Sequence, residues 1–143
     1  MHQLIKTIFK AGALIFDAQH RVLAVHKRGK PPNEYIVPGG KIEPGETDEE
    51  ALRRELSEEL NVSIRSIRPY EEFQAKAIYE DALLVMRTYF VSIERTPIPG
   101  NEIDYLVWLD AHFKTSGYQF ASILGQQILP RLFAEGHLGT LRH

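Results

Sequence analysis

The sequence lacks several features that would each point to a class of protein. Its 143 residues contain no cysteine, which excludes disulfides, thiolate metal sites and a cysteine nucleophile. No apolar run approaches the roughly 20 residues that a membrane-spanning helix needs. Positive charge is not in excess, with 17 Lys+Arg against 19 Asp+Glu, so binding to polymeric nucleic acid through its phosphates is not expected. No membrane partner is expected either, and the missing cysteine fits the reducing cytoplasm.

What is present is typical of one globular domain over residues 1–143, with 43% hydrophobic and 25% charged residues. Proline and glycine cluster in short segments that predict loops inside this domain and not boundaries between domains. The apolar stretch 11–16 near the N-terminus is short and is followed at once by Asp17 and other polar residues. We therefore expect a buried strand there and not a signal peptide, which also favours a cytoplasmic location.

Hydrophobic periodicity predicts the order of secondary structure. Strand-like runs cover residues 8–16, 21–26, 35–37, 64–67, 70–78, 83–93 and 103–109. The first two are expected to form a hairpin across a turn at 17–20, and a further turn is expected at 79–81. Helical patterns cover 47–60 and 122–134, and Pro130 is expected to kink or split the second. This order predicts an α/β fold, a mixed sheet with helices packed on it.

The helix predicted over 47–60 carries an unusual group of acidic residues. Thr47 and Glu50 have the spacing of a capping box, which marks the start of the helix. Glu55, Glu58 and Glu59 then fall within one arc of about 100° beside the leucine stripe. Like charges at this spacing cost helix stability a few tenths of a kcal/mol per pair. An all-oxygen cluster of this kind suits a hard cation such as Mg²⁺ or Mn²⁺.

The segment before this helix supplies further candidates for the same site. Gly39 and Gly40 follow a short strand, and paired glycines allow the backbone to approach a ligand closely. A backbone carbonyl here could complete the oxygen shell of a metal ion. Arg54 is placed either to hold Glu58, four residues further along the helix, or to pair with Glu46.

Residues 40–62 resemble the Nudix box, GX5EX7REUXEEXGU, in which U is a bulky apolar residue. The matching residues are Gly40, Glu46, Arg54, Glu55, Leu56, Glu58, Glu59 and Val62. Asn61 stands where the family has glycine, and because asparagine tolerates the left-handed conformation we expect a small cost in stability and no lost chemistry. A weaker similarity to the MutT-like branch covers Tyr35–Gly39 and Glu102–Asp110.

The resemblance implies an α/β/α sandwich around a mixed sheet, and an enzyme that hydrolyses a nucleoside diphosphate linked to another group. It implies a divalent metal, Mg²⁺ or Mn²⁺, held by the side chains of Glu55, Glu58 and Glu59 and by the carbonyl of Gly39. Glu102 matches an acidic residue that ligates the metal or acts as base in MutT-like members, although a plain loop carboxylate is the alternative. The catalytic residues expected from the box and this position are Arg54, Glu55, Glu58, Glu59 and Glu102.

The substrate expected from the MutT-like order is a nucleoside triphosphate, modified or not, which would give a monophosphate and pyrophosphate. ADP-ribose or a nucleotide sugar is the alternative. Arg28, in a basic cluster with Lys27 and Lys30, and Lys41 are candidates for binding substrate phosphates, although the cluster is equally typical of a solvated turn. Tyr118 and Phe120 are candidates for stacking on a base, with ordinary packing as the alternative.

Two other classes of function compete with the enzyme. A binding module that keeps the fold without turnover would be indicated by a degraded box, and this chain keeps every box carboxylate. A Ca²⁺-binding helix unit would need the D-x-[DN]-x-[DN]-G loop spacing, which the chain lacks. The sequence leaves the oligomeric state open.

Overall fold

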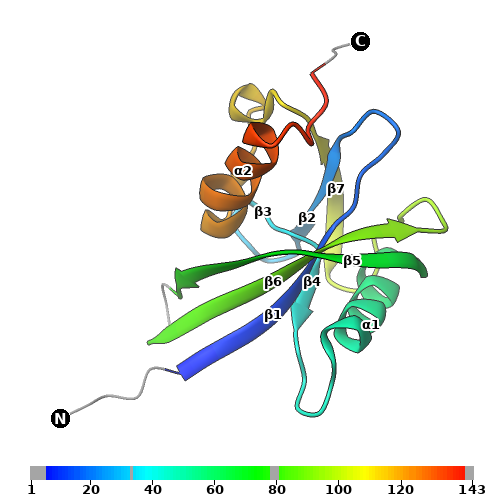
Figure 1. The fold of residues 1–143 in the computed structure, drawn as a ribbon, viewed down its shortest axis with the longest axis vertical. Helices are drawn as coiled ribbons and strands as arrows, with labels where there is room; N and C mark the ends of the chain where they lie inside the picture. Colours follow the sequence, from blue (N-terminus) through cyan, green and yellow to red (C-terminus); the bar gives the residue numbers. More distant parts are fainter. Residues whose placement is uncertain (1–5, 33, 78–80, 141–143) are drawn as a thin grey trace.

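The computed structural model describes residues 6–32, 34–77 and 81–140. Its largest element is a four-stranded sheet in the order β4-β1-β6-β5 (Figure 1). The strands are β1 (Lys6–Leu14), β4 (Gly39–Lys41), β5 (Ile64–Lys76) and β6 (Ala82–Ile93). β1 is parallel to β6 and antiparallel to β4, and β5 is antiparallel to β6, so the sheet is mixed, as expected.

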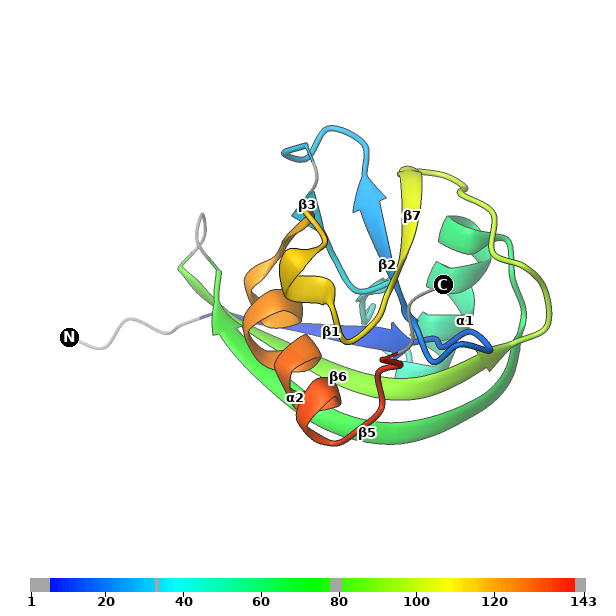
Figure 2. The ribbon, with the colours of Figure 1, turned by 90° about the horizontal axis from the view of Figure 1, so that it is seen from above.

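Two shorter strand pairs complete the β structure. β2 (Val22–Lys27) pairs antiparallel with β7 (Ile103–Leu109). β3 (Glu34–Tyr35) pairs in parallel with β8 (Gln119–Phe120). These pairs lie across from the curved four-stranded sheet when the molecule is seen from above (Figure 2).

The helices lie apart, and each covers a core cluster of its own. α1 (Asp48–Leu60) buries Leu52, Leu56 and Leu60 against one cluster. The π-helical segment η2 (Ile123–Ile128) and α2 (Leu129–Ala134) bury apolar side chains in the other cluster, beside which the short 3₁₀ turn η1 (Phe113–Thr115) lies. Figure 2 shows α1 and α2 at opposite ends of the strands. This arrangement confirms the predicted α/β fold. Among the described residues, no helix is both long and apolar enough to cross a membrane.

The predicted hairpin between the first two strands forms only at its tip. Phe16 and Val22 form an isolated bridge, and beyond it β1 and β2 separate into different sheets. Because residues 11–15 are buried without interruption, β1 needs neighbours on both edges, and it finds them in β4 and β6.

One further boundary differs from the sequence prediction. The runs predicted at 64–67 and 70–78 form one strand, β5, whose pairing with β6 shifts register between Pro69 and Glu72. The irregularity allows a proline to lie within a strand. The turn predicted at 79–81 falls for the most part outside the described residues.

The break predicted at Pro130 appears as a change of helix type. The N–H of Leu129 bonds to the carbonyl of Leu124, five residues back, so the chain enters Pro130 from a π-helical turn. Pro130 has no N–H and is tolerated in the first turn of α2, where no intrahelical donor is needed. The helical pattern over 122–134 is therefore confirmed, with a π-helical segment in place of a sharp kink.

His26 is a buried polar residue that ties β2 to two neighbouring segments. Its Nδ1 lies 2.6 Å from Asp104 Oδ1 on β7, and its Nε2 lies 3.0 Å from the carbonyl of Pro31. A carboxylate and a carbonyl both accept hydrogen bonds, so both ring nitrogens donate at the same time only when the ring is protonated. The bond to Asp104 raises the pKa of His26 and burial opposes that rise.

This pair predicts how stability depends on pH. Because the folded pKa of His26 is raised, its contribution is fully present below the unfolded value of about 6.5 and is lost as the pH rises through the folded pKa. His26→Gln should therefore destabilise the protein more at about pH 5.5 than at about pH 8.5, as measured by urea unfolding. Asp104→Asn should show the same trend because it removes the same pair. A loss of stability independent of pH in both variants would contradict the assignment.

Candidate active site

The carboxylates singled out in the sequence meet in one cleft. It has a volume of about 320 Å³ and lies between α1, the strands β1, β2 and β4, and the loop before β7. Its lining residues are Lys10, Lys27, Gly40, Lys41, Glu43, Glu55, Glu58, Glu59, Asn101 and Glu102. The structure thus brings four predicted metal ligands and the predicted phosphate-binding residue Lys41 to the same place.

Glu59 is the buried member of the group, with only 4% of its surface exposed. Its Oε1 accepts a hydrogen bond of 3.1 Å from the backbone N–H of Gly39. Burial raises the pKa of Glu59 to about 7, while the Gly39 hydrogen bond and the charge of Lys27 act in the opposite direction. A neighbouring positive charge in the cleft would favour the ionised form.

Gly39 cannot be replaced by a larger residue at this position. Its φ is +130°, and a Cβ would lie 2.1 Å from the carbonyl oxygen of Ala11 on β1. Glycine therefore lets β4 approach β1 and brings its own N–H to Glu59. The structure assigns Gly39 this donor role, and its predicted role as a carbonyl ligand of a metal remains a prediction.

Arg54 positions two carboxylates, one in the cleft and one in the loop before α1. Its Nε and Nη2 donate to the two oxygens of Glu46 at 2.8 and 2.9 Å, and its Nη1 donates to Glu55 Oε1 at 2.8 Å. Of the two pairings expected for Arg54, the one with Glu46 is present. The Arg54 guanidinium lowers the pKa of Glu46 to about 2. Arg54 therefore fixes Glu55 at the cleft and anchors the loop before α1 through Glu46.

Gly40 leaves the space that Glu55 occupies. A Cβ on Gly40 would lie 2.6 Å from the carboxyl carbon of Glu55, which is too close for any real contact. The second glycine of the pair is thus explained by a close approach between β4 and a carboxylate of α1.

The loop that carries Glu102 is attached to the end of α1. Asn61 adopts the left-handed conformation that the sequence predicted, with φ 56°. Its side-chain amide donates to the carbonyl of Ile98 at 3.1 Å, and the N–H of Gly100 donates to the carbonyl of Glu59 at 2.8 Å. The Gly100 bond satisfies a carbonyl at the helix C-terminus, and the two bonds together hold Glu102 beside the carboxylates of α1.

The donor set fits a hard divalent cation. Five carboxylates line one cleft, the four predicted ligands and Glu43, and oxygen ligands are those that Mg²⁺ and Mn²⁺ prefer. In the part of the chain that the structure describes, no three acidic or imidazole side chains already converge on a single point. Glu55 is held by Arg54 and Glu59 by Gly39, so the carboxylates have other partners in this form. The residues that would hold the ion are Glu55, Glu58, Glu59 and Glu102.

Lysine side chains line the same cleft, and one was not identified from the sequence. Lys10 lies in the middle of β1 opposite Lys41, and Lys27 ends β2. Burial lowers the pKa of Lys10, and the charges of Lys27 and Lys41 lower it further. A lysine inside an otherwise apolar strand was the signal that could have identified Lys10. The three cations face the carboxylates, as expected for a site that binds a polyanion with metal.

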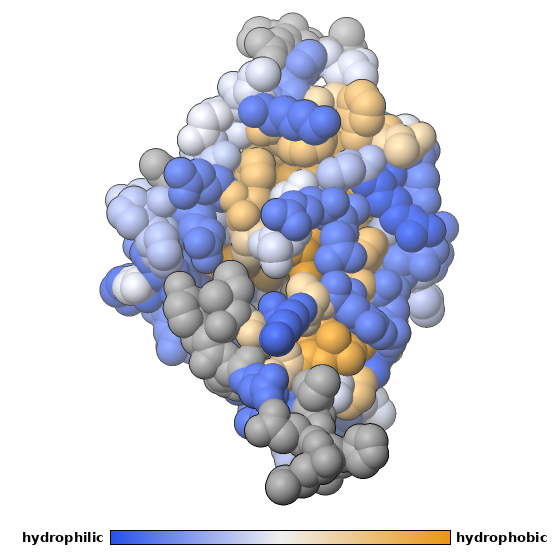
Figure 3. Space-filling view, turned by 90° about the vertical axis from the view of Figure 1, so that its left-hand side faces the viewer, coloured by the Kyte–Doolittle hydropathy of each residue, from blue (hydrophilic) through white to orange (hydrophobic). Residues whose placement is uncertain are grey.

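An apolar recess of about 110 Å³ adjoins the cleft. It shares Lys10, Lys27 and Gly40 with the cleft and is otherwise lined mainly by apolar side chains from β6, η2 and the segment before β4. On the side of the molecule that carries α2, hydrophobic residues form a band between hydrophilic groups (Figure 3). The recess places an apolar surface next to the charged cleft.

Three of the predicted substrate-binding residues do not line the cleft or this recess. Arg28 donates to the carbonyl of Asn101 at 3.3 Å, so it contacts the loop that carries Glu102. Tyr118 packs edge-on against Tyr35, with ring centroids 5.0 Å apart. Phe120 packs against Phe113 and the core cluster under η2. Their predicted contacts with substrate remain predictions.

Comparison with known proteins assigns the chain to a family. The Nudix domain family matches residues 6–113. An 8-oxo-dGTP diphosphatase from Haemophilus influenzae is 33% identical over 100 residues, which cover 70% of this chain and 71% of that protein. The chain therefore belongs to the Nudix family, whose members hydrolyse phosphoanhydride bonds and generally need a divalent metal.

Other relatives match over shorter stretches or by fold alone. The nucleoside triphosphatase NudI of an Enterobacter species is 49% identical over 45 residues, which cover 30% of this chain and 32% of that protein. The MutT protein from Methanosarcina mazei has a TM-score of 0.79 at 15% identity and covers 94% of this chain and 99% of its own. The Escherichia coli ORF135 protein has a TM-score of 0.72 at 22% identity, with 94% of each chain covered.

The role assigned to Glu58 can be tested against a matched residue on the same helix. Glu58 is exposed and lines the cleft, whereas Glu49 is exposed at the other end of α1, outside the cleft. Glu58→Gln should lower kcat by at least about 10²-fold, because it removes a carboxylate that is predicted to bind metal or accept a proton. Glu49→Gln should leave the rate close to normal. Thermal unfolding should show that both variants fold, and equal rates for the two would contradict the site.

Proposed function

We propose that this protein hydrolyses nucleoside triphosphates to the monophosphate and pyrophosphate, with Mg²⁺ or Mn²⁺ as the metal. The observation that carries the proposal is a cleft lined by five carboxylates and three lysines beside an apolar recess. The relatives named 8-oxo-dGTP diphosphatase and nucleoside triphosphatase support this class of substrate. The cytoplasmic location expected from the sequence remains a prediction.

The divalent metal, when bound, would neutralise phosphate oxygens and lower the pKa of a water molecule. Lys10, Lys27 and Lys41 supply positive charge to the remaining phosphate oxygens. Arg54 keeps Glu55 in position through its bond of 2.8 Å. Glu58 and Glu102 are exposed to the cleft and are the candidates for accepting the proton of the attacking water.

We place the nucleobase of the substrate in the apolar recess. Because the recess shares Lys10, Lys27 and Gly40 with the cleft, one ligand can occupy both spaces. Ile123, Leu124, Leu84 and Met86 provide apolar surface for a flat ring. Lys10 then lies at the junction between the ring and the phosphates.

The products formed in ¹⁸O-labelled water test the proposed function. After chelation, with Mg²⁺ or Mn²⁺ restored, several nucleoside triphosphates and ADP-ribose are compared by kcat/KM and by the phosphorus that gains the label. We expect monophosphate and pyrophosphate from triphosphates, since a pyrophosphohydrolase attacks inside the phosphate chain. Orthophosphate as the primary product would rule the proposal out. AMP and ribose 5-phosphate formed much faster than any triphosphate product would replace the substrate by the alternative, ADP-ribose.

Lys10 provides a second test, directed at substrate binding. Lys10→Met should lower kcat/KM by about tenfold to a hundredfold, because hydrogen bonds to charged groups contribute about 1.5–3 kcal/mol. Lys10→Arg should recover part of the loss, since it restores the charge. Lys114→Met, at an exposed position in η1 away from the cleft, is the control and should have no effect. An unchanged kcat/KM for Lys10→Met would remove this residue from the binding site.

A further inference from the structure

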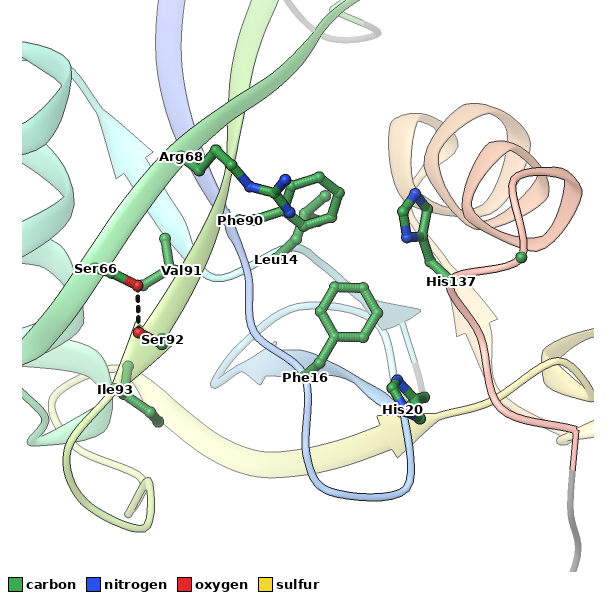
Figure 4. Close-up of a pocket in the computed structure, with 11 residues that line it drawn as sticks. Leu14, Phe16, His20, Ser66, Arg68, Phe90, Val91, Ser92, Ile93 and His137 are labelled. Atoms are coloured by element: carbon green, nitrogen blue, oxygen red, sulfur yellow. Dashed lines mark hydrogen bonds between the residues drawn. The ribbon is translucent and has the colours of Figure 1, made fainter.

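A second, larger cavity lies apart from the candidate active site. Its volume is about 540 Å³, and it shares no lining residue with the cleft or the adjoining apolar recess. It is formed by the paired strands β5 and β6, the turn between β1 and β2, and the segment after α2 (Figure 4). Neither the box residues nor the proposed function accounts for it.

One wall of this cavity is a block of four residues on two paired strands. Ser66 on β5 lies opposite Ser92 on β6, and Arg68 lies opposite Phe90. Residues two apart on a strand point to the same face, so all four side chains share one surface. The hydroxyls of Ser66 and Ser92 lie 2.5 Å apart and share a hydrogen bond (Figure 4). The wall therefore combines a guanidinium, two hydroxyls and an aromatic ring.

Aromatic rings from three separate segments surround Phe90. The ring centroids of Phe16 and His137 lie 6.0 and 5.2 Å from that of Phe90, and Tyr70 packs against Phe90 at 4.6 Å. Arg68 lies over the same ring, with its Cζ 4.8 Å from the centroid. Figure 4 shows Phe16, Phe90 and His137 around the opening between the strands and the end of α2. These rings offer flat surfaces to a planar ligand.

The cavity is lined by a guanidinium and by no carboxylate. The guanidinium is that of Arg68, and the other lining residues are neutral side chains and the two histidines His20 and His137. Among the described residues, no carboxylate lies within ion-pair distance of Arg68. Glu135 lies 3.3 Å from His137 Nε2, but Arg131 also binds Glu135, so the negative charge is already paired. An anion entering the cavity would meet a guanidinium and hydroxyl donors without a facing carboxylate.

We propose that this cavity is a second ligand site, one that binds a phosphomonoester carrying a flat aromatic ring. The phosphate binds to Arg68 and the hydroxyls of Ser66 and Ser92, and the ring packs among Phe16, Phe90 and His137. The volume lies within the range of about 300–1,000 Å³ that is usual for small-molecule sites. Nucleoside monophosphates belong to this chemical class. The site involves no residue of the catalytic cleft, so the proposal does not depend on the activity.

Phenyl phosphate is the probe for the test, since it joins one ring to one phosphate and contains no phosphoanhydride bond. It is titrated into the full chain labelled with ¹⁵N, and amide shifts are followed by NMR. We expect saturable shifts at residues lining the cavity, with cross-relaxation between the ring protons of the probe and those of Phe16 and Phe90. Inorganic phosphate and phenol, which each carry half of the probe, should bind at least about tenfold more weakly.

A pair of arginine variants on one strand separates the site from general charge. Arg68→Gln should weaken binding by about tenfold or more, whereas Arg65→Gln, an exposed neighbour on β5 that does not line the cavity, should bind normally. The wild-type cross-relaxation test remains valid if Arg68→Gln fails to fold. The proposal is overturned if shifts do not saturate, if both variants weaken binding equally, or if the shifts centre on Lys10, Lys27 and Lys41.

Discussion

The hydrogen bond between the Gly39 N–H and the buried carboxylate of Glu59 joins the two parts of the candidate active site. It connects the short strand β4 to the last turn of α1, across a distance of twenty residues in the sequence. The leucine side of α1 is buried in the core, so the helix cannot turn away from this contact. Burial raises the pKa of Glu59, and a cation in the cleft would act in the opposite direction and favour its ionised form.

The remaining parts of the site are fixed by contacts at either end of α1. Before the helix, Arg54 binds Glu46 and Glu55 together and so sets the loop and one carboxylate. After the helix, Asn61 and Gly100 attach the loop that brings Glu102 to the cleft. Asn61 therefore does more than replace a family glycine, because its side chain adds a bond to Ile98 that glycine could not make.

The polar chemistry of the molecule is divided between two places. In the cleft, carboxylates and lysines lie together, which suits a metal-bound polyphosphate. In the cavity between β5, β6 and the end of α2, arginine, hydroxyls and aromatic rings lie together without a carboxylate among the lining residues, which suits an anion that binds without metal. The family motif accounts for the first place only, because no residue of the box reaches the second.

The sequence alone was enough to predict the box residues, the capped helix 47–60 with its acidic face and the mixed α/β class. These features could be predicted because capping and helical periodicity are local. It did not allow the partners of β1 to be predicted, since a strand buried on both faces carries no pattern that selects its neighbours. The predicted pairing of the first two strands was therefore longer than the single bridge that forms. The place of Lys10 in the cleft was also not predicted, nor was the surface formed by Ser66, Arg68, Phe90 and Ser92. Their meaning depends on strand register, which brings distant residues together only in the tertiary structure.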